Sequence, residues 1–230
     1  SCLIIPSKLW KNTVDFKEDL YKLSRVLKTQ LLKTNAEVRY NTKVTQELIE
    51  EIKPDVVIVA TGAVPIIPPI PGINGNNVYL ASEVEEKGTD QLGDEIVILG
   101  GGLVGCETAI HLGKLGKKVT VVEMRSEAAA DCNCFHKIAI GMELEKYVTV
   151  LTDTKAENIT DKGLEGLDKD GNKIFVPADA VICAAGMRSD TTVADMVQKM
   201  EIEMYVIGDA VRPNKVTQAI FDGYYIAKYL

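Results

Sequence analysis

Apolar residues along the chain occur in two patterns, short continuous runs and longer stripes at helical spacing. The continuous runs lie at 55–60, 95–99, 118–122 and 180–185. The stripes lie at 103–116, 131–146, 189–200 and 217–230. Continuous runs are typical of strands covered on both faces of a parallel sheet, and the stripes are typical of helices packed on such a sheet. The alternation predicts an α/β fold.

The segments before and between these elements are less regular. Asp15-x-x-Glu18 is typical of a capping pair, and it precedes an amphipathic stripe that ends near Leu31. Glu37–Tyr40 predicts a short strand. Prolines 65, 68, 69 and 71 indicate either an extended crossing between domains or an ordinary proline-rich loop. Tyr147–Leu151 predicts a third parallel strand, and 156–176 predicts an antiparallel meander with a tight turn at Asp170-Gly171-Asn172.

The segment 95–123 has the strongest motif. A strand leads into Gly100-x-Gly102-x-x-Gly105, a helix follows, and a second strand ends at Glu123. Gly100 allows a tight turn, and Gly102 has no Cβ, so a pyrophosphate can approach the backbone. Gly105 lets the helix pack close to the strand. This arrangement is the unit that binds a dinucleotide, whereas GxGxxG alone would indicate only a glycine-rich turn.

The motif predicts a role for each of its residues. Backbone amides at the helix start would receive the NADH pyrophosphate, and they belong to Gly100, Gly102, Leu103, Val104 and Gly105. Glu123, 23 residues after Gly100, would bind the adenosine ribose and repel a phosphate on it, which favours NADH over NADPH. Arg125 weakens that preference. Gly186, which follows an apolar strand, lies either near the nicotinamide or in a simple turn.

Composition and charge disfavour several classes of partner, cofactor and location. The chain has 230 residues, a net charge of −7 and 46% hydrophobic residues, which is ordinary for a globular protein and disfavours nucleic acid or an anionic membrane as a partner. No apolar run approaches the roughly 20 residues of a membrane span. Five cysteines without a CxxC pair predict reduced thiols and a cytoplasmic location. Cys132, Cys134 and His136 fit no common zinc spacing, so exposed or packing thiols are the favoured interpretation and no metal is predicted.

Four motifs in this order resemble the two-dinucleotide-binding-domain flavoproteins, in which an NAD(P)H domain is inserted into an FAD domain. The motifs are 60–62 (ATG), 100–107 (GGGLVGCE), 184–188 (AAGMR) and 205–210 (YVIGDA), the last continuing through 216–223. The sequences of 186–189 and 205–224 are similar to those in the carboxyl-terminal part of 2-enoate and 2,4-dienoyl-CoA reductases. These are NADH:flavin oxidoreductases with an amino-terminal old-yellow-enzyme barrel that carries FMN and an iron–sulfur cluster.

The resemblance implies three segments and a second set of site residues. Residues 1–66 and 203–230 would form an incomplete FAD-binding Rossmann-like domain, and 67–202 an NAD(H)-binding domain with a parallel sheet and a meander. Asp209 would bond the FAD ribityl chain with Gln218 and Ala219 nearby. Thr61 and Gly62 would lie close to the flavin, and Gly208 would belong to the same partial FAD site. Glu107, at the family's usual place after the glycine loop, would orient either the nicotinamide or the helix start.

The chain departs from the family before Asp55, where no GxGxxG for FAD occurs, and the barrel is absent. The resemblance therefore implies a carboxyl-terminal piece that offers only part of an FAD site. Because the missing first strand would lie at the centre of the FAD sheet, we expect exposed sheet edges. Residues 1–66 and 203–230 would then be either poorly supported or completed by another chain, a second copy included.

The sequence supports two main functions. The first is the nucleotide-binding part of an NADH-dependent flavin reductase that passes a hydride from NADH to FAD and on to an enoate-type substrate in the barrel. The second is a non-catalytic NAD(H)-binding or regulatory module. A direct dehydrogenase would need an acid–base residue beside the nicotinamide, and neither His111 nor any other residue is a good candidate. No catalytic residue is assigned, because the cofactors carry hydride chemistry.

Overall fold

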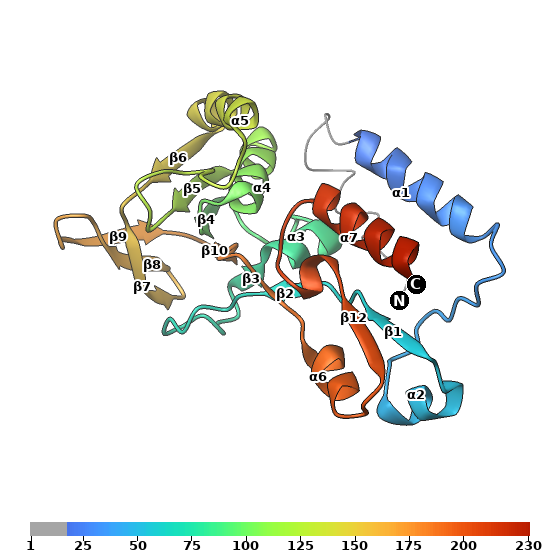
Figure 1. The fold of residues 1–230 in the computed structure, drawn as a ribbon. Helices are drawn as coiled ribbons and strands as arrows, with labels where there is room; N and C mark the ends of the chain where they lie inside the picture. Colours follow the sequence, from blue (N-terminus) through green and yellow to red (C-terminus); the bar gives the residue numbers. More distant parts are fainter. Residues whose placement is uncertain (1–17) are drawn as a thin grey trace. The chain divides into compact units, whose positions relative to one another are not determined.

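The computed structural model describes residues 18–230, which fall into two compact units (Figure 1). The larger unit contains 65–186, and the smaller contains 28–64 and 187–230. The helix α1 (Glu18–Leu31) spans the division, and Asp15 of its expected cap lies outside the described residues. By their contacts, residues 187–202 belong to the smaller unit, whereas the sequence analysis assigned them to the NAD(H)-binding domain.

The larger unit is built on a five-stranded parallel sheet. Its strands, in spatial order, are β3 (Val78–Leu80), β10 (Ala180–Cys183), β4 (Glu95–Leu99), β5 (Lys118–Val122) and β6 (Val148–Leu151). Its helices are α3 (Ala81–Lys87), α4 (Leu103–Lys114) and α5 (Cys134–Tyr147). A separate antiparallel meander comprises β7 (Lys155–Thr160), β8 (Gly163–Leu167) and β9 (Lys173–Pro177). This is the Rossmann-like α/β fold that the sequence predicted.

Both faces of this sheet are covered (Figure 1). Ile96 and Ile98 of β4 pack on one side with apolar residues of α3 and α4. Val97 and Leu99 pack on the other side with apolar residues of the meander. Successive side chains of a strand point to opposite faces, so a strand enclosed between two layers must be apolar at every position. The continuous runs at 95–99 and 180–185 have this cause.

Local polar contacts set several element boundaries. The helix predicted from residue 131 begins at Cys134, because the Asn133 side chain accepts a hydrogen bond from the His136 N–H at 2.9 Å and caps it. The predicted turn at 170–172 is present, and the Asp168 carboxylate holds it by accepting from the Asp170 and Asn172 N–H groups.

The smaller unit contains two short sheets. In the first, β1 (Val56–Val59) pairs in parallel with β12 (Glu203–Val206). In the second, β2 (Ala63–Pro65) pairs with β11 (Met187–Ser189). Its remaining elements are α2 (Gln46–Ile52), α6 (Thr192–Gln198), the short 3₁₀ helix η2 (Gly208–Ala210) and α7 (Val216–Tyr229).

Two expectations for the smaller unit were wrong. Residues 37–40 are described and form no strand; the chain runs irregularly to α2, which Thr45 caps by accepting from the Leu48 N–H. The strand β1 is not buried on both faces, because Ile58 is 42% exposed. In the described part of the chain β12 is its only partner strand, and no residue of α7 is buried. The unit therefore leaves apolar surface uncovered.

The close approach of α4 to the end of β4 generates a stability prediction. A Cβ on Gly105 would lie 2.0 Å from the carbonyl oxygen of Gly100, a backbone atom that cannot move aside. We expect Gly105→Ala to lower the free energy of unfolding by about 1–3 kcal/mol or more, measured by urea unfolding with circular dichroism.

Gly141→Ala in α5 is the matched control. A Cβ there would meet no atom within 4 Å in the described part of the molecule. The higher helix propensity of alanine should then raise the free energy of unfolding by roughly 0.5–1 kcal/mol. Equal effects of the two substitutions would contradict the packing argument.

Candidate functional site

A cavity of about 860 Å³ lies in the larger unit at the carboxyl ends of its parallel strands. The strand ends that line it include Leu99, Val122 and Ala184. It brings together five residues that the sequence assigned to NADH, namely Gly100, Gly102, Glu123, Arg125 and Gly186. Ligands of open α/β sheets bind at this edge, so the position fits the predicted class of site.

Gly100 turns the chain between two neighbouring strands. Its N–H donates to the Val122 carbonyl at 2.9 Å, and its φ of +109° is a conformation that favours glycine. A Cβ there would lie 2.5 Å from the Ala184 carbonyl oxygen. The tight turn predicted for Gly100 is therefore present, and it brings the following residues to the cavity.

Gly102 is the N-cap residue of α4 and lines the cavity. In the described part of the molecule, the only atoms within 4 Å of a Cβ built on it are the carboxylate oxygens of Asp131, at 3.7 and 3.9 Å. Asp131 Oδ1 also accepts a hydrogen bond from the Leu103 N–H at 2.9 Å. The backbone at Gly102 is therefore open to the cavity except where Asp131 covers it.

Glu123 is held in place by its neighbours. Its side chain is only 5% exposed. Its Oε2 accepts from the Gly101 N–H at 2.7 Å, and its Oε1 accepts from the N–H of Arg125 at 2.8 Å and from Arg125 Nε at 3.2 Å. The end of β5 is thereby tied to the glycine turn by a carboxylate.

These hydrogen bonds determine the pKa of Glu123. Burial acts to raise the pKa of the carboxyl group, because it disfavours the charged form. The N–H groups of Arg125 and Gly101, together with the Arg125 guanidinium, outweigh burial and hold the pKa below its usual range. Glu123 is therefore an anion at neutral pH.

The other four residues assigned to NADH lie outside the cavity lining, namely Leu103, Val104, Gly105 and Glu107. Gly105 packs on Gly100, and Val104 in the first turn of α4 is 51% exposed. Glu107 is buried on α4, with its Oε1 3.8 Å from Nε2 of His136 on α5. It interacts with the neighbouring helix, and its role toward the nicotinamide stays a prediction.

Several lining residues were not predicted. They are Pro68, Pro69, Ile70, Met124, Asp131, Thr154, Lys155, Ala156, Glu157 and Ala185. Met124 and Ala185 closely follow the carboxyl ends of β5 and β10, and that position is the signal that would have identified them. Lys155, Ala156 and Glu157 instead begin β7. Asp131 has no such signal, since it lies in the middle of the connection between β5 and α5.

The residues assigned to FAD lie in the smaller unit, where most of them form hydrogen bonds with other residues of that unit. The Thr61 hydroxyl donates to the Asp190 carbonyl at 2.9 Å, and the Gly62 carbonyl accepts from the Asp190 N–H at 3.0 Å. Asp209 Oδ1 accepts from the Asn214 N–H at 3.0 Å.

Asp222, which the sequence analysis missed, connects two more of these residues. Its carboxylate accepts from the Gly208 N–H at 2.9 Å and from Gln218 Nε2 at 2.7 Å. A Cβ on Gly208 would lie 3.4 Å from the Ala219 Cβ, so helix α7 packs closely on this turn.

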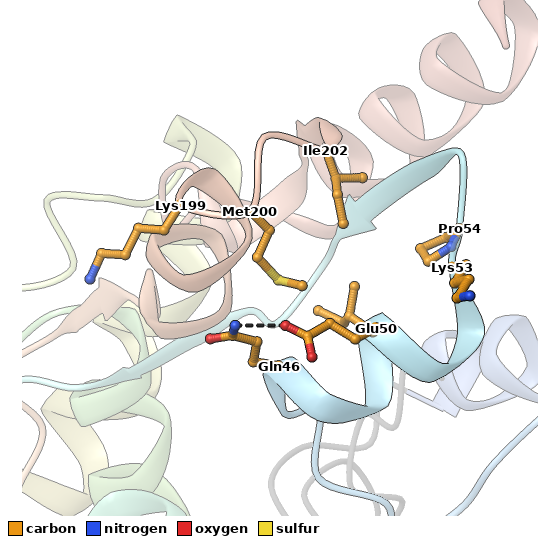
Figure 2. A pocket seen from close by; sticks show the side chains of 8 residues that line it. Gln46, Glu50, Lys53, Pro54, Lys199, Met200 and Ile202 are labelled. Atoms are coloured by element: carbon orange, nitrogen blue, oxygen red, sulfur yellow. Dashed lines mark hydrogen bonds between the residues drawn. The ribbon is translucent and has the colours of Figure 1, made fainter.

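A second cavity, of about 540 Å³, lies in the smaller unit between α2 and the connection from α6 to β12 (Figure 2). Gln46 and Glu50 are joined across one turn of α2 by a 2.7 Å hydrogen bond, and Met200 and Ile202 line the other side. It contains none of the predicted site residues.

The described thiols and acids do not form a metal site. Among the side chains that the structure describes, residues 22–84 and 88–230, no group of three or more His, Cys, Asp or Glu is placed to hold a metal ion. Burial raises the pKa of the Cys106 thiol to about 12, and its Sγ donates to the Gly101 carbonyl at 3.3 Å. Cys106 is thus a neutral packing group under the glycine turn. Among the described helices, none is both long and apolar enough to span a bilayer.

The sequence of this chain matches a known protein family. The model of the family described as pyridine nucleotide-disulphide oxidoreductase matches residues 3–223. NADH oxidase of Thermoanaerobacter brockii is 31% identical over 206 residues, a match that covers 87% of this chain and 32% of that protein. Cinnamate reductase of Clostridium sporogenes is 31% identical, with 93% of this chain and 32% of that protein covered.

A solved structure of 2-naphthoyl-CoA reductase with 2-naphthoyl-CoA has the same fold. It superposes with a TM-score of 0.89 at 30% identity and covers 97% of this chain and 34% of that one. The chain therefore spans about a third of the length of these relatives. The predicted resemblance to enoate-reductase-type flavoproteins is confirmed.

The environment of Glu123 generates a pH prediction. Because its pKa is lower in the folded than in the unfolded chain, its carboxylate stabilises the fold at neutral pH, and this contribution is lost as the pH falls below about 4.3 toward the folded pKa. Glu123→Gln should lower the free energy of unfolding near neutral pH by about 1–3 kcal/mol, because an amide N–H₂ would face an N–H donor.

The same variant should lose less stability than wild type on acidification. Urea unfolding near pH 7 and near pH 3.5 checks both effects, with the exposed Glu145→Gln as control. If Glu123→Gln and wild type lost stability equally in acid, the assignment of the lowered pKa to Glu123 would be wrong.

Proposed function

The chain belongs to the pyridine nucleotide-disulphide oxidoreductase family, and on that premise we propose that it binds NADH in the 860 Å³ cavity as the nucleotide-binding part of an NADH-dependent flavin reductase. The observation that carries the proposal is the convergence of the glycine turn, Glu123 and Gly186 on that one cavity. These residues are separated by more than 80 positions in the sequence, and the parallel strands bring them to one edge.

The residues present fit a dinucleotide. Gly102 is the position where a Cβ would obstruct a pyrophosphate, and the first amides of α4 have no carbonyl partner within the helix. Three acceptor positions of the Glu123 carboxylate are in use, which leaves about one for a ribose hydroxyl. The nicotinamide end would lie toward Ala184–Gly186. When bound, the reduced nicotinamide supplies a hydride.

The chain's own residues position and select the ligand. Arg125 holds Glu123 from one side and Gly101 holds it from the other, so the carboxylate needs no reorganisation on binding. Its fixed negative charge disfavours a 2′-phosphate. Arg125 and Lys155 also line the cavity and add positive charge, although Lys155 Nζ lies 3.2 Å from the Glu157 carboxylate. This charge reduces the selectivity without reversing it.

For the whole protein we propose hydride transfer from NADH to FAD and on to an enoate-type substrate in an old-yellow-enzyme barrel that carries FMN and an iron–sulfur cluster. Support comes from cinnamate reductase and 2-naphthoyl-CoA reductase, of whose length this chain spans about a third. The exposed β1 and α7 are surfaces that the rest of an FAD domain, or a second copy of the chain, would cover.

The alternative is a non-catalytic NAD(H)-binding module. It is favoured by the smaller unit, where Asp209 and Gly208 already have hydrogen-bond partners and β1 has one partner strand in the described part of the chain. Stoichiometric FAD and NADH-dependent dye reduction by the longer protein would support the reductase. NADH binding without flavin in any context would support the module. The described cysteines are free thiols, which supports a cytoplasmic location for either.

The decisive test of nucleotide binding is Gly102→Ala. Its φ of −68° suits alanine and the nearest atoms are at 3.7 Å, so the only expected cost is that of a poorer N-cap residue, about 0.5–1 kcal/mol in the free energy of unfolding. The added methyl group would occupy the approach to the backbone, so we expect NADH affinity to fall about tenfold or more by calorimetry. Gly141→Ala should leave affinity unchanged. Undiminished binding by the Gly102 variant would contradict the location of the site.

Cofactor choice is tested with the same method. Wild type should bind NADH about tenfold more tightly than NADPH, because the Glu123 carboxylate repels the additional phosphate. Glu123→Ala should bring the two affinities together. Equal affinities in wild type would overturn the preference for NADH while leaving the binding site itself in place.

A further inference from the structure

The connection between β5 and α5, residues 123–133, folds across the glycine turn and contacts it at three places. Glu123 accepts from the Gly101 N–H, and the Ala129 N–H donates to the Gly101 carbonyl at 2.7 Å. The third contact is the hydrogen bond from the Leu103 N–H to Asp131. Two carboxylates of this connection are thus bound to amides of the glycine turn and of the first residue of α4.

We propose that Asp131 is an internal competitor for the dinucleotide: its carboxylate occupies the position at the start of α4 that a ligand pyrophosphate takes, and it must leave when the ligand binds. The inference rests on the proposed function, and it adds a residue that sets the affinity of the site. Position is the first argument. The two oxygens of Asp131 are what a Cβ on Gly102 would meet, and that is the face through which the pyrophosphate approaches.

Electrostatics is the second argument. The amino-terminal end of a helix carries partial positive charge and unpaired N–H groups, and it stabilises whichever anion lies there. In the chain itself that anion is Asp131. A pyrophosphate and a carboxylate cannot share the Leu103 N–H at close range without repulsion between like charges. Binding therefore requires one anion to replace the other.

The contrast with Glu123 shows which carboxylate can move. Glu123 is buried and accepts three hydrogen bonds, so its displacement would leave a charge and several donors without partners. Asp131 is exposed, and in the described part of the chain its carboxylate accepts one hydrogen bond. Water can solvate Asp131 as soon as it leaves, so the cost of displacing it is small enough for a ligand to overcome.

The test is Asp131→Asn, which keeps an acceptor oxygen for the Leu103 N–H and removes the charge. By calorimetry we expect NADH and ADP to bind about tenfold more tightly than to wild type. Adenosine, which has no phosphate, should bind equally to both. The gain for NADH should shrink when the salt concentration is raised about tenfold, because salt screens the exposed charge. Asp170→Asn, in the β8–β9 turn, removes the same charge outside the cavity lining and should change none of these affinities.

Each other outcome has a definite meaning. Unchanged or weaker binding of NADH and ADP by Asp131→Asn, while wild type binds both, overturns the competitor role and leaves the proposed function intact. A loss of affinity for NADH and adenosine alike, with a lower urea midpoint, assigns Asp131 a purely structural capping role and also overturns it. If neither wild type nor any variant binds NADH or ADP, the proposed function fails and this inference fails with it.

Discussion

The structure of the larger unit depends on one close contact, between the carbonyl oxygen of Gly100 and the first turn of α4 at Gly105. Because no Cβ separates them, α4 begins directly at the end of β4 and returns along the sheet, where Ala109 and Leu112 are fully buried against it. The same contact places the amino-terminal end of α4 at the edge where β5 and β10 also end. The cavity lies there, where three strand ends and one helix start meet.

The sheet of the larger unit was predictable because the requirement that defines its strands can be read from a few consecutive residues. A strand between two packed layers has to be apolar at every position, and that requirement is visible in five consecutive residues such as 95–99. The three-residue strand β3 was missed because so short a segment shows no periodicity, and α3 follows it directly. In the smaller unit the same rule gave a wrong prediction. Val56–Val59 has the composition of an enclosed strand, yet Ile58 is exposed, because enclosure depends on elements that a local pattern does not contain.

The residues of the site were likewise predictable only where a local requirement fixes the residue type. Gly100, Gly102 and Glu123 were identified from the sequence because the turn, the approach to the backbone and the end of β5 each impose a residue type at a fixed spacing. Asp131 was not, because its position depends on the path of the preceding connection. That path is set by Ala129, whose φ of +51° and hydrogen bond to the Gly101 carbonyl direct the chain back over the glycine turn. A left-handed alanine has no sequence signal, so only the structure places this carboxylate beside Gly102.

The two carboxylates at the glycine turn reflect a conflict between the stability of the ligand-free fold and the binding of an anionic ligand. Amides that point into a cavity to receive an anion are unsatisfied donors when no ligand is bound, and a buried donor without a partner costs about 1–3 kcal/mol. The chain meets this requirement with its own carboxylates, Glu123 on Gly101 and Asp131 on Leu103. Each such contact stabilises the ligand-free fold and opposes an anionic ligand. Burial separates the two roles: the enclosed Glu123 is a permanent part of the turn, whereas the exposed Asp131 can be exchanged for a phosphate because water accepts it at little cost.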